Sequence, residues 1–266
     1  MNIFLKTEDE IHYMVETCRL VSATLACLTR HIRPGVNTEH LNKVAEEFIR
    51  DHGATPSFKG YPNPYGSPFP AGICTSVNDE VVHGIPNVHT VLQDGDIISI
   101  DCGVLLNGFH GDSCYTFGVG NLAPETRSLL QASKQALNKG IAQAVAGNHL
   151  GDIGHAISAE AHAQGCRVIR CFSGHGIGQS LHEPPLVRNY GSSGRGILLK
   201  EGMCLAIEPI LTSGNAQVVR QSDRWTFKTK DSHPAAHYEH TIVVRRGKAQ
   251  VLSSFDEIEQ LEGNIY

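Results

Sequence analysis

Three features that would set the class of a protein are absent from this sequence. None of its 266 residues belong to an apolar run of the roughly 18 residues that a membrane-spanning helix requires. The stretch from Met1 to Thr7 is too short an apolar run for a secretory signal. There is no basic stripe or arm, and the net charge of -5 argues against a dedicated nucleic-acid site. We therefore expect a cytoplasmic protein that binds neither membranes nor nucleic acids.

The eight cysteines include no CxxC pair, so the spacing typical of zinc and redox motifs is missing. We interpret them as reduced thiols, because a chain of this length can bury a core without disulfides. The composition, 41% hydrophobic and 18% charged, is that of a globular protein without low-complexity tracts. The length permits one large domain or two fused halves.

The first part of the chain predicts two helices. Thr7, with a glutamate three residues later, forms a capping box ahead of an apolar periodicity that continues to Leu28. A second amphipathic helix begins at Asn37 or Thr38 and ends at Gly53.

A similar helix pair is predicted downstream. One helix covers about Pro124 to Ala146, and a shorter one ends at Gly165. The spacing from Gly35 to Gly53 equals that from Gly147 to Gly165, which favours two related halves. Coincidence between two ordinary helix hairpins would explain the same spacing.

Strand patterns are stronger, and they centre on a hairpin. Ile97–Val104 forms one apolar run, Asn107 and Gly108 are the favoured dipeptide of a tight turn, and Phe109–Phe117 can return. Further strands are predicted at Val168–Phe172, Met203–Ile207, Ala216–Val219 and Glu239–Val244. The fold class is therefore α+β, with mainly antiparallel strands and helices gathered on one side.

Two aspartates in the hairpin suggest a metal site. With a two-residue turn, Asp101 faces Cys114 and Gly103 faces Asp112, so both carboxylates share one face as diagonal neighbours. Buried carboxylates need a compensating cation, and no lysine or arginine occurs between Lys59 and Arg127. A metal ion is the simplest compensation. The alternative is a pair of turn or edge aspartates that face water.

Three further side chains are candidate ligands, although each has an ordinary explanation on its own. Glu208 ends an apolar strand, and the following proline prevents continued pairing. Glu239 begins another apolar strand. His175 lies in a GHGIG segment, which we interpret as a loop whose glycines leave the imidazole accessible.

Two familiar motifs are excluded by their spacing. The GxGxG pattern around His175 is not the GxGxxG dinucleotide fingerprint. His182 and Glu183 are not part of an HExxH zinc helix, because Pro184 and Pro185 break the helix that this motif needs.

Taken together, the motifs resemble type I methionine aminopeptidase over nearly the whole chain. The segments that carry the resemblance are VVHGIP at 81–86, Ile100-Asp101, Gly111-Asp112, GHGIG at 174–178, HEPP at 182–185, Ile207-Glu208-Pro209 and YEHT at 238–241. The resemblance implies the pita-bread fold, in which two related halves surround a central antiparallel sheet with helices on its outer face. A single peptidase domain would cover residues 1–266, with halves of roughly 1–120 and 121–266.

The resemblance also implies roles for the candidate ligands. Asp101 would chelate one divalent ion, His175 and Glu208 a second, while Asp112 and Glu239 would bridge both. Such a donor set suits Co, Mn, Fe or Zn and does not select among them.

Catalytic roles also follow from the resemblance. Glu208 would also shuttle the proton. His83 would hydrogen-bond the substrate backbone, and His182 would stabilise the tetrahedral intermediate.

The resemblance places a methionine pocket beside the metal ions, lined by positions that match Tyr61, Cys74, Leu181 and Trp225. The long proline-rich segment 62–72 departs from the family pattern, so either Tyr61 or Tyr65 can approach the pocket. Segment 62–72 is alternatively a stiff surface loop.

Three more histidines lie near the motifs. His110 shares the strand parity of Asp112 and is a candidate for orienting a ligand. We expect structural or surface roles for His237 and His240.

The activity implied is removal of the N-terminal methionine from nascent polypeptides, preferentially when the second residue is small and uncharged. We expect a monomer that meets its substrates near the ribosome. Two alternatives stay open: a proline-specific peptidase of the same fold, and a catalytically inactive relative used as a binding module. The length argues against the first, and the five retained ligands argue against the second.

Overall fold

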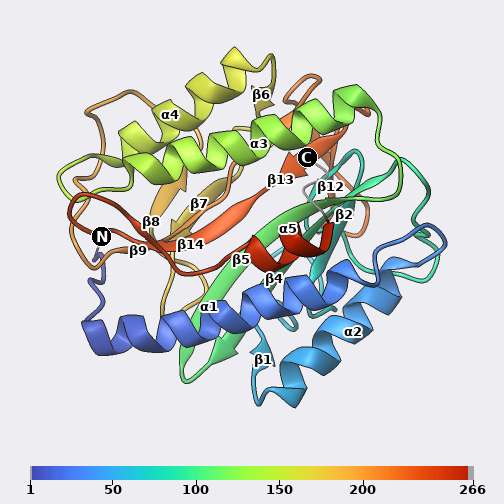
Figure 1. The fold of residues 1–266 in the computed structure, drawn as a ribbon, viewed down its shortest axis with the longest axis horizontal. Coiled ribbons are helices and arrows are strands. Elements are labelled where there is room, and N and C mark those ends of the chain that lie inside the picture. The colour runs from blue at the N-terminus through green and yellow to red at the C-terminus, as the bar shows by residue number, and fades with distance from the viewer. Residues whose placement is uncertain (1, 263–266) are drawn as a thin grey trace.

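The computed structural model describes residues 2–262, and its centre is an antiparallel sheet with helices on one face (Figure 1). The strands of this sheet are, in spatial order, β1 (Thr55–Pro56), β4 (Ile97–Leu106), β5 (Phe109–Gly118), β14 (Glu239–Val243), β9 (Cys204–Ile207), β7 (Ser173–Gly176) and β8 (Glu183–Arg188). Two further strands join it: β2 (Cys74–Val77) pairs with β4, and β15 (Gln250–Val251) pairs with β14. The predicted α+β class with antiparallel strands is confirmed.

Two small sheets flank the central one. The first contains β13 (Ala235–His237), β10 (Ile210–Thr212) and β6 (Arg167–Val168). The second contains β11 (Val218–Arg220), β12 (Phe227–Thr229) and β3 (Glu80–Val82). β11 and β12 form a hairpin whose turn carries Trp225.

The first two helices agree with the sequence prediction. α1 (Glu8–Thr29) begins with the predicted capping box of Thr7, and α2 (Thr38–Asp51) is capped by the side chain of Asn37. The buried stripe of α1 packs on β4 and β5. This pair therefore covers the half of the sheet that contains the hairpin.

The second helix pair covers the other half. α3 (Pro124–Gln143) packs along α4 (Leu150–Ala163), and α3 also contacts β9 and β14. Figure 1 shows α1 with α2 in the lower part of the view and α3 with α4 in the upper part, and α1 and α3 pass in front of strands of the sheet. The short α5 (Asp256–Glu262) lies against α1.

Two predicted strands were wrong in extent. Of the segment Ala216–Val219, only Val218 and Val219 are in a strand, within β11. Only Val168 of the segment Val168–Phe172 is in a strand, within the two-residue β6. The next strand, β7, begins after this segment and belongs to the central sheet. β7 was missed because two of its four residues are glycine, which has a low strand propensity.

The main hydrophobic core lies between the sheet and the helices. Tyr115, Phe117 and Tyr238 are its largest fully buried side chains. A second cluster, which includes Phe58, Phe69 and Leu181, borders the cavity described below. No helix among residues 2–262 is long and apolar enough to cross a membrane.

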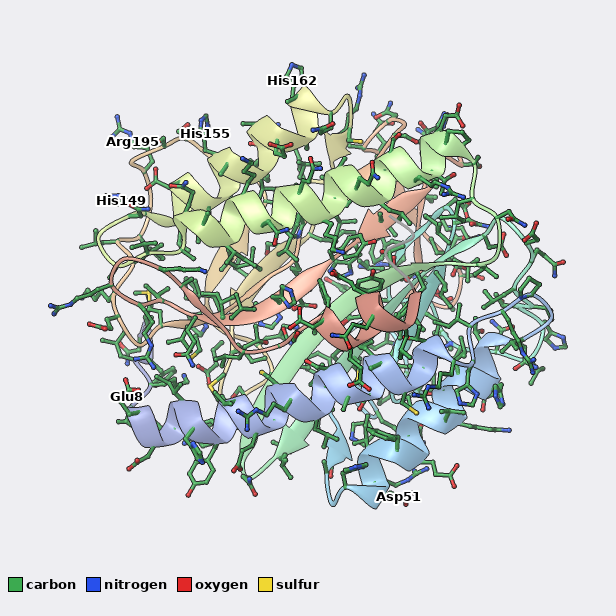
Figure 2. All side chains as sticks on the ribbon, viewed as in Figure 1. Glu8, Asp51, His149, His155, His162 and Arg195 are labelled. Atoms are coloured by element: carbon green, nitrogen blue, oxygen red, sulfur yellow. The ribbon has the colours of Figure 1, made fainter. Side chains whose placement is uncertain are left out.

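All eight cysteines are free, which agrees with the prediction of reduced thiols. Figure 2 shows that charged and histidine side chains such as those of Glu8, Asp51 and His162 point outward from the edges of the fold. The acidic side chains that are candidate metal ligands instead line a cavity inside the protein.

Candidate active site

A cavity of about 150 Å³ lies on the face of the sheet opposite the core. Eleven residues predicted to bind metal, act in catalysis or line the pocket all line it, together with two phenylalanines that the prediction missed. The lining is Phe58, Tyr61, Phe69, Cys74, His83, Asp101, Asp112, His175, Leu181, His182, Glu208, Trp225 and Glu239.

The β4–β5 hairpin has the predicted register. Asp101 pairs with Cys114 and Gly103 with Asp112, around a turn in which Asn107 and Gly108 both have positive φ. The two aspartate side chains are within hydrogen-bonding reach of each other. The alternative of water-facing edge aspartates is wrong, because β4 and β5 are interior strands of the sheet.

Strand register also explains how the two glutamates reach the aspartates. Glu239 of β14 pairs with Cys114, so it lies in the same cross-strand row as Asp101. The β14–β9 register pairs His240 with Ile207, and one further residue along this ladder is Glu208. The row also includes Cys74, which pairs with Asp101 from the other side.

His175 lies in a strand, which corrects the prediction of an exposed glycine loop. It belongs to β7 and is buried, with a relative exposure of 4%. Its glycine neighbours serve close packing: a Cβ on Gly174 would lie 2.2 Å from the carbonyl oxygen of Ala206, and one on Gly176 2.3 Å from that of Pro184. Pairing with Ala206 directs His175 to the same face as Glu208.

The imidazole of His175 is oriented for ligation. Its Nδ1 lies 2.8 Å from the carbonyl oxygen of Gly176 and so donates to it, which leaves the lone pair on Nε2. Nε2 lies 3.6 Å from Oε1 of Glu208 and 4.0 Å from Oδ2 of Asp112. Burial lowers the pKa of His175 to about 3, so the ring is neutral at pH 7.

The four carboxyl groups are crowded and poorly solvated. Burial raises the pKa of Asp101 to about 7. Burial, followed by the charges of the neighbouring carboxylates, raises the pKa of Asp112, Glu208 and Glu239 well above the ordinary range. Such a cluster of like charges destabilises the ionised state unless a cation lies among them.

The donor set fits divalent metal ions. One oxygen each of Asp101, Asp112 and Glu239 is buried without a hydrogen-bond partner. Donor atoms of Asp112, His175 and Glu239 lie within 4.8 Å of one another. Among the residues that the structure describes, no lysine or arginine lines the cavity. Carboxylate oxygens with one imidazole nitrogen are ligands that Mn, Fe, Co and Zn accept.

Two histidines lie beside the carboxylates. The ring of His182 contacts that of His175 at 4.3 Å between centroids, and its Nδ1 lies 2.6 Å from the hydroxyl of Tyr61. The ring of His83 packs edge-on against Trp225 at 6.0 Å. Burial lowers the pKa of both histidines, that of His83 to about 4, so both rings are neutral at pH 7.

The remaining wall of the cavity is apolar and aromatic. Phe69 packs against Trp225 with 5.1 Å between ring centroids, and Phe58 and Leu181 belong to the same cluster. Phe58 and Phe69 were missed because neither lies in a motif that carries chemistry. The available signal was two phenylalanines flanking a proline-rich loop, which needs a buried anchor to remain in place.

The proline-rich segment forms a loop whose two ends are joined by backbone hydrogen bonds. Phe69 N–H donates to the carbonyl of Tyr61, and Gly60 N–H donates to that of Phe69. Tyr61 therefore lines the cavity, whereas Tyr65 at the tip is 66% exposed. The surface-loop interpretation holds for the tip and fails at Phe69, which is buried.

The three additional histidines have different surroundings. Nδ1 of His110 lies 2.8 Å from the hydroxyl of Ser57, and among residues 2–262 no hydrogen bond joins this ring to a candidate ligand. His240 is buried, bonds Ser253 and stacks on Phe255, a structural role as expected. His237 is buried with Nε2 3.7 Å from Glu208, which excludes a surface role.

Comparison with known proteins decides the family. The model of metallopeptidase family M24 matches residues 12–246. The chain belongs to this family. It is therefore a metal-dependent peptidase, and the prediction of divalent metal cofactors is confirmed at that level.

Two close relatives refine the assignment of this M24 peptidase. It is 45% identical over 251 residues to the methionine aminopeptidase of Clostridium acetobutylicum, covering 94% of this chain and 98% of that protein. The crystal structure of methionine aminopeptidase from Rickettsia prowazekii matches with a TM-score of 0.91 at 38% identity, covering 95% and 100% of the two chains. The chain thus has the pita-bread fold and belongs with the methionine aminopeptidases, as its motifs predicted.

A prolidase from Pyrococcus furiosus also shares the fold. Its TM-score is 0.74 at 19% identity, and the match covers 94% of this chain but 65% of the prolidase. At this identity the likeness concerns the fold alone.

Proposed function

We propose that this peptidase hydrolyses the first peptide bond of polypeptides that begin with methionine, with a preference for a small, uncharged second residue. The observation that carries the proposal is a single cavity with two unlike ends. One end holds the cluster of metal donors, and the other holds an apolar, aromatic recess of the size and chemistry that an unbranched thioether side chain fits.

Five side chains would hold the metal ions. Asp101 would bind one ion, His175 and Glu208 the other, and Asp112 and Glu239 both. When bound, a pair of divalent ions supplies Lewis acidity and electrostatic stabilisation for amide hydrolysis.

Glu208 is the proposed proton carrier. Its carboxylate lines the metal end of the cavity, with Oε1 3.6 Å from Nε2 of His175, so it is placed beside the water that the metal ions would activate, and a carboxylate can act there as a general base. It can accept a proton from the attacking water and deliver it to the leaving amine.

His182 is proposed to donate a hydrogen bond to the tetrahedral intermediate. Burial raises the pKa of Tyr61, so its hydroxyl stays protonated and can donate to Nδ1 of His182. The neutral ring then carries its proton on Nε2. A donor fixed in this way stabilises developing negative charge without reorganisation.

His83 is proposed to bind the substrate backbone near the scissile bond. It follows β3 with φ of 59°, and its neutral ring is held by aromatic neighbours rather than by a charged partner. A neutral imidazole can exchange hydrogen bonds with a peptide group.

We also propose that the chain acts as a monomeric, single peptidase domain in the cytoplasm, on nascent chains near the ribosome. Free thiols at all eight cysteines suit a reducing compartment. The repeated pairing of two helices with one half of the sheet supports related halves of roughly 1–120 and 121–266.

A peptide panel tests the activity. The purified protein, loaded in turn with Co, Mn, Fe or Zn, should release methionine from Met-Ala-Ser and leave N-acetylated Met-Ala-Ser intact. Leucine at the first position or a bulky second residue should lower kcat/KM. Cleavage of the blocked peptide at an equal rate would refute the aminopeptidase mechanism.

The two alternatives give different results in the same panel. A proline-specific peptidase would prefer Ala-Pro-Ser to Met-Ala-Ser. An inactive binding relative would cleave no peptide with any of the four metals, although it would still bind them.

A further inference from the structure

A second cavity of about 240 Å³ adjoins the first one on its outer side. Within residues 2–262, the two cavities share only His83 and Trp225. The outer cavity is lined by Phe172, Arg220 and Phe227 and by the tip of the proline-rich segment, residues 62–65.

The proline-rich tip is held in place rather than free. The side-chain amide of Asn63 donates to the carbonyl of Arg224, and the indole N–H of Trp225 donates to the carbonyl of Ser67. The stem of Arg224 also packs on Gly66, where an added Cβ would lie 3.3 Å from it. The outer cavity is therefore formed by two segments that brace each other.

Arg220 is positioned by aromatic rings. Its guanidinium lies 4.9 Å from the ring centroid of Tyr65 and 5.1 Å from that of Phe227. Two such contacts hold the charged group at the cavity wall while leaving its hydrogen-bond donors free for another partner.

Among residues 2–262, no carboxylate forms an ion pair with Arg220. The nearby acids have other partners. Asp79 and Glu80 pair with Lys228, and Asp223 accepts hydrogen bonds from Trp225 and Thr226 within its own turn. The positive charge of Arg220 is thus available to an occupant of the cavity.

The outer cavity lies where a bound peptide would continue. A substrate whose first residue is at the metal end has its scissile bond near His83, and its following residues must leave the inner cavity. The ring of Phe227 is 6.5 Å from that of His83 and 5.1 Å from the guanidinium of Arg220. Since an extended residue spans about 3.3 Å, Arg220 is within reach of the third or fourth residue.

We propose that Arg220 and the braced tip of segment 62–68 form a subsite that favours an acidic side chain at the third or fourth residue of the substrate. This inference rests on the proposed aminopeptidase function and adds a preference beyond the second residue. Arg220 acts as a specificity-determining residue, and Tyr65 and Phe227 position its guanidinium.

The test uses the metal-loaded, full-length protein and C-terminally amidated peptides, which lack a terminal carboxylate. The two series are Met-Ala-X-Ala-amide and Met-Ala-Ala-X-Ala-amide, with X as Asp, Asn or Lys. In at least one series we expect kcat/KM to be about three- to tenfold higher for Asp than for Lys, mainly through KM. The preference should shrink in 1 M salt, where charges are screened within about 3 Å.

Variants separate a charge effect from a structural one. Arg220→Glu should reverse the order of the Asp and Lys peptides, and Arg220→Lys should keep it. Arg195→Glu is the matched control, because Arg195 points outward beside α4 (Figure 2) and lines neither cavity; it should retain the wild-type order. If Arg220→Glu does not fold, Arg220→Gln and the salt series carry the same test.

The outcomes distinguish the two proposals. If the wild-type protein cleaves no peptide, the proposed function fails. If it cleaves all of them with equal kcat/KM, or if Arg220→Glu has the wild-type order, the subsite is refuted while the aminopeptidase function stands.

Discussion

The two ends of the active-site cavity are built differently. Asp101, Asp112 and His175 lie within strands β4, β5 and β7, and the two glutamates lie at the ends of adjoining strands. In contrast, Tyr61, Phe69, Leu181 and Trp225 lie in connecting segments. The comparison indicates that the chemistry depends on paired backbone, whereas substrate selection depends on loops that can change without disturbing it.

The largest expected effect comes from the strand-built end. Glu208→Ala should lower kcat by at least about 10³-fold, because it removes a metal donor and the proposed proton carrier together. The free energy of unfolding of the metal-free protein should not fall, since one of four crowded carboxylates is removed. Steady-state kinetics and denaturant unfolding measure both. Glu47→Ala, at an exposed position of α2, is the control, and retained full activity of Glu208→Ala would disprove the assignment.

The segment that carries His182 should depend on one buried ion pair. Nζ of Lys6 lies 2.6 Å from Oε2 of Glu183, and both side chains are less than 10% exposed. Lys6→Ala should lower the free energy of unfolding by about 3–5 kcal/mol, because it leaves a buried carboxylate unpaired. Guanidinium unfolding measures the loss.

A double variant checks the reason for this loss. Lys6→Met combined with Glu183→Gln removes both charges and should recover most of the stability. An equal loss in the single and double variants would show that packing, and not the unpaired charge, dominates.

The loop-built end should affect recognition without affecting the metal ions. Trp225→Ala removes the contact with Phe69 and the hydrogen bond to Ser67, and should lower kcat/KM for methionine peptides about 100-fold. Metal affinity, measured by calorimetry, should match the wild type. Trp225→Phe keeps the ring but lacks the N–H, so its loss should be smaller. Weaker metal binding in Trp225→Ala would show that the loop-built end also affects the metal site.

The smallest effect concerns His83, which lies between the ends. Burial lowers its pKa to about 4 from an ordinary 6.5, so between these pH values the unfolded chain binds a proton that the folded chain does not. Stability should therefore fall as the pH falls from 6.5 to 4. His83→Gln should reduce this fall by on the order of 2 kcal/mol, since the ring is partly exposed.

Urea unfolding across that pH range measures the slope. His155→Gln, whose side chain points to solvent in Figure 2, is the control and should keep the wild-type slope. An unchanged slope in His83→Gln would show that His83 is more solvated than its surroundings indicate.

Local sequence signals predicted the parts of the fold that depend on short-range contacts. The capping box at Thr7, the cap at Asn37 and the tight turn at Asn107 and Gly108 each involve residues a few positions apart. The same turn fixed the register of Asp101 and Asp112, because cross-strand partners follow directly from the turn length.

Local sequence signals could not predict which distant strands pair in the sheet. Glu239 meets Asp101 because β14 pairs with β5, and His175 meets Glu208 because β7 pairs with β9. Nothing in the neighbouring residues of either strand specifies such a partner. Only the family resemblance placed His175, Glu208 and Glu239 in one site. The strand that holds His175 was predicted to be a loop.

The sequence by itself determined the helices, the hairpin and, through its motifs, the family. The tertiary structure decided which tyrosine reaches the pocket, that Phe58 and Phe69 complete it, and that Arg220 faces an outer cavity between two braced segments. The physical reason is distance along the chain. Hydrogen bonds within a turn are encoded by adjacent residues, whereas a cavity wall is formed by side chains that meet only after the sheet and its loops have packed.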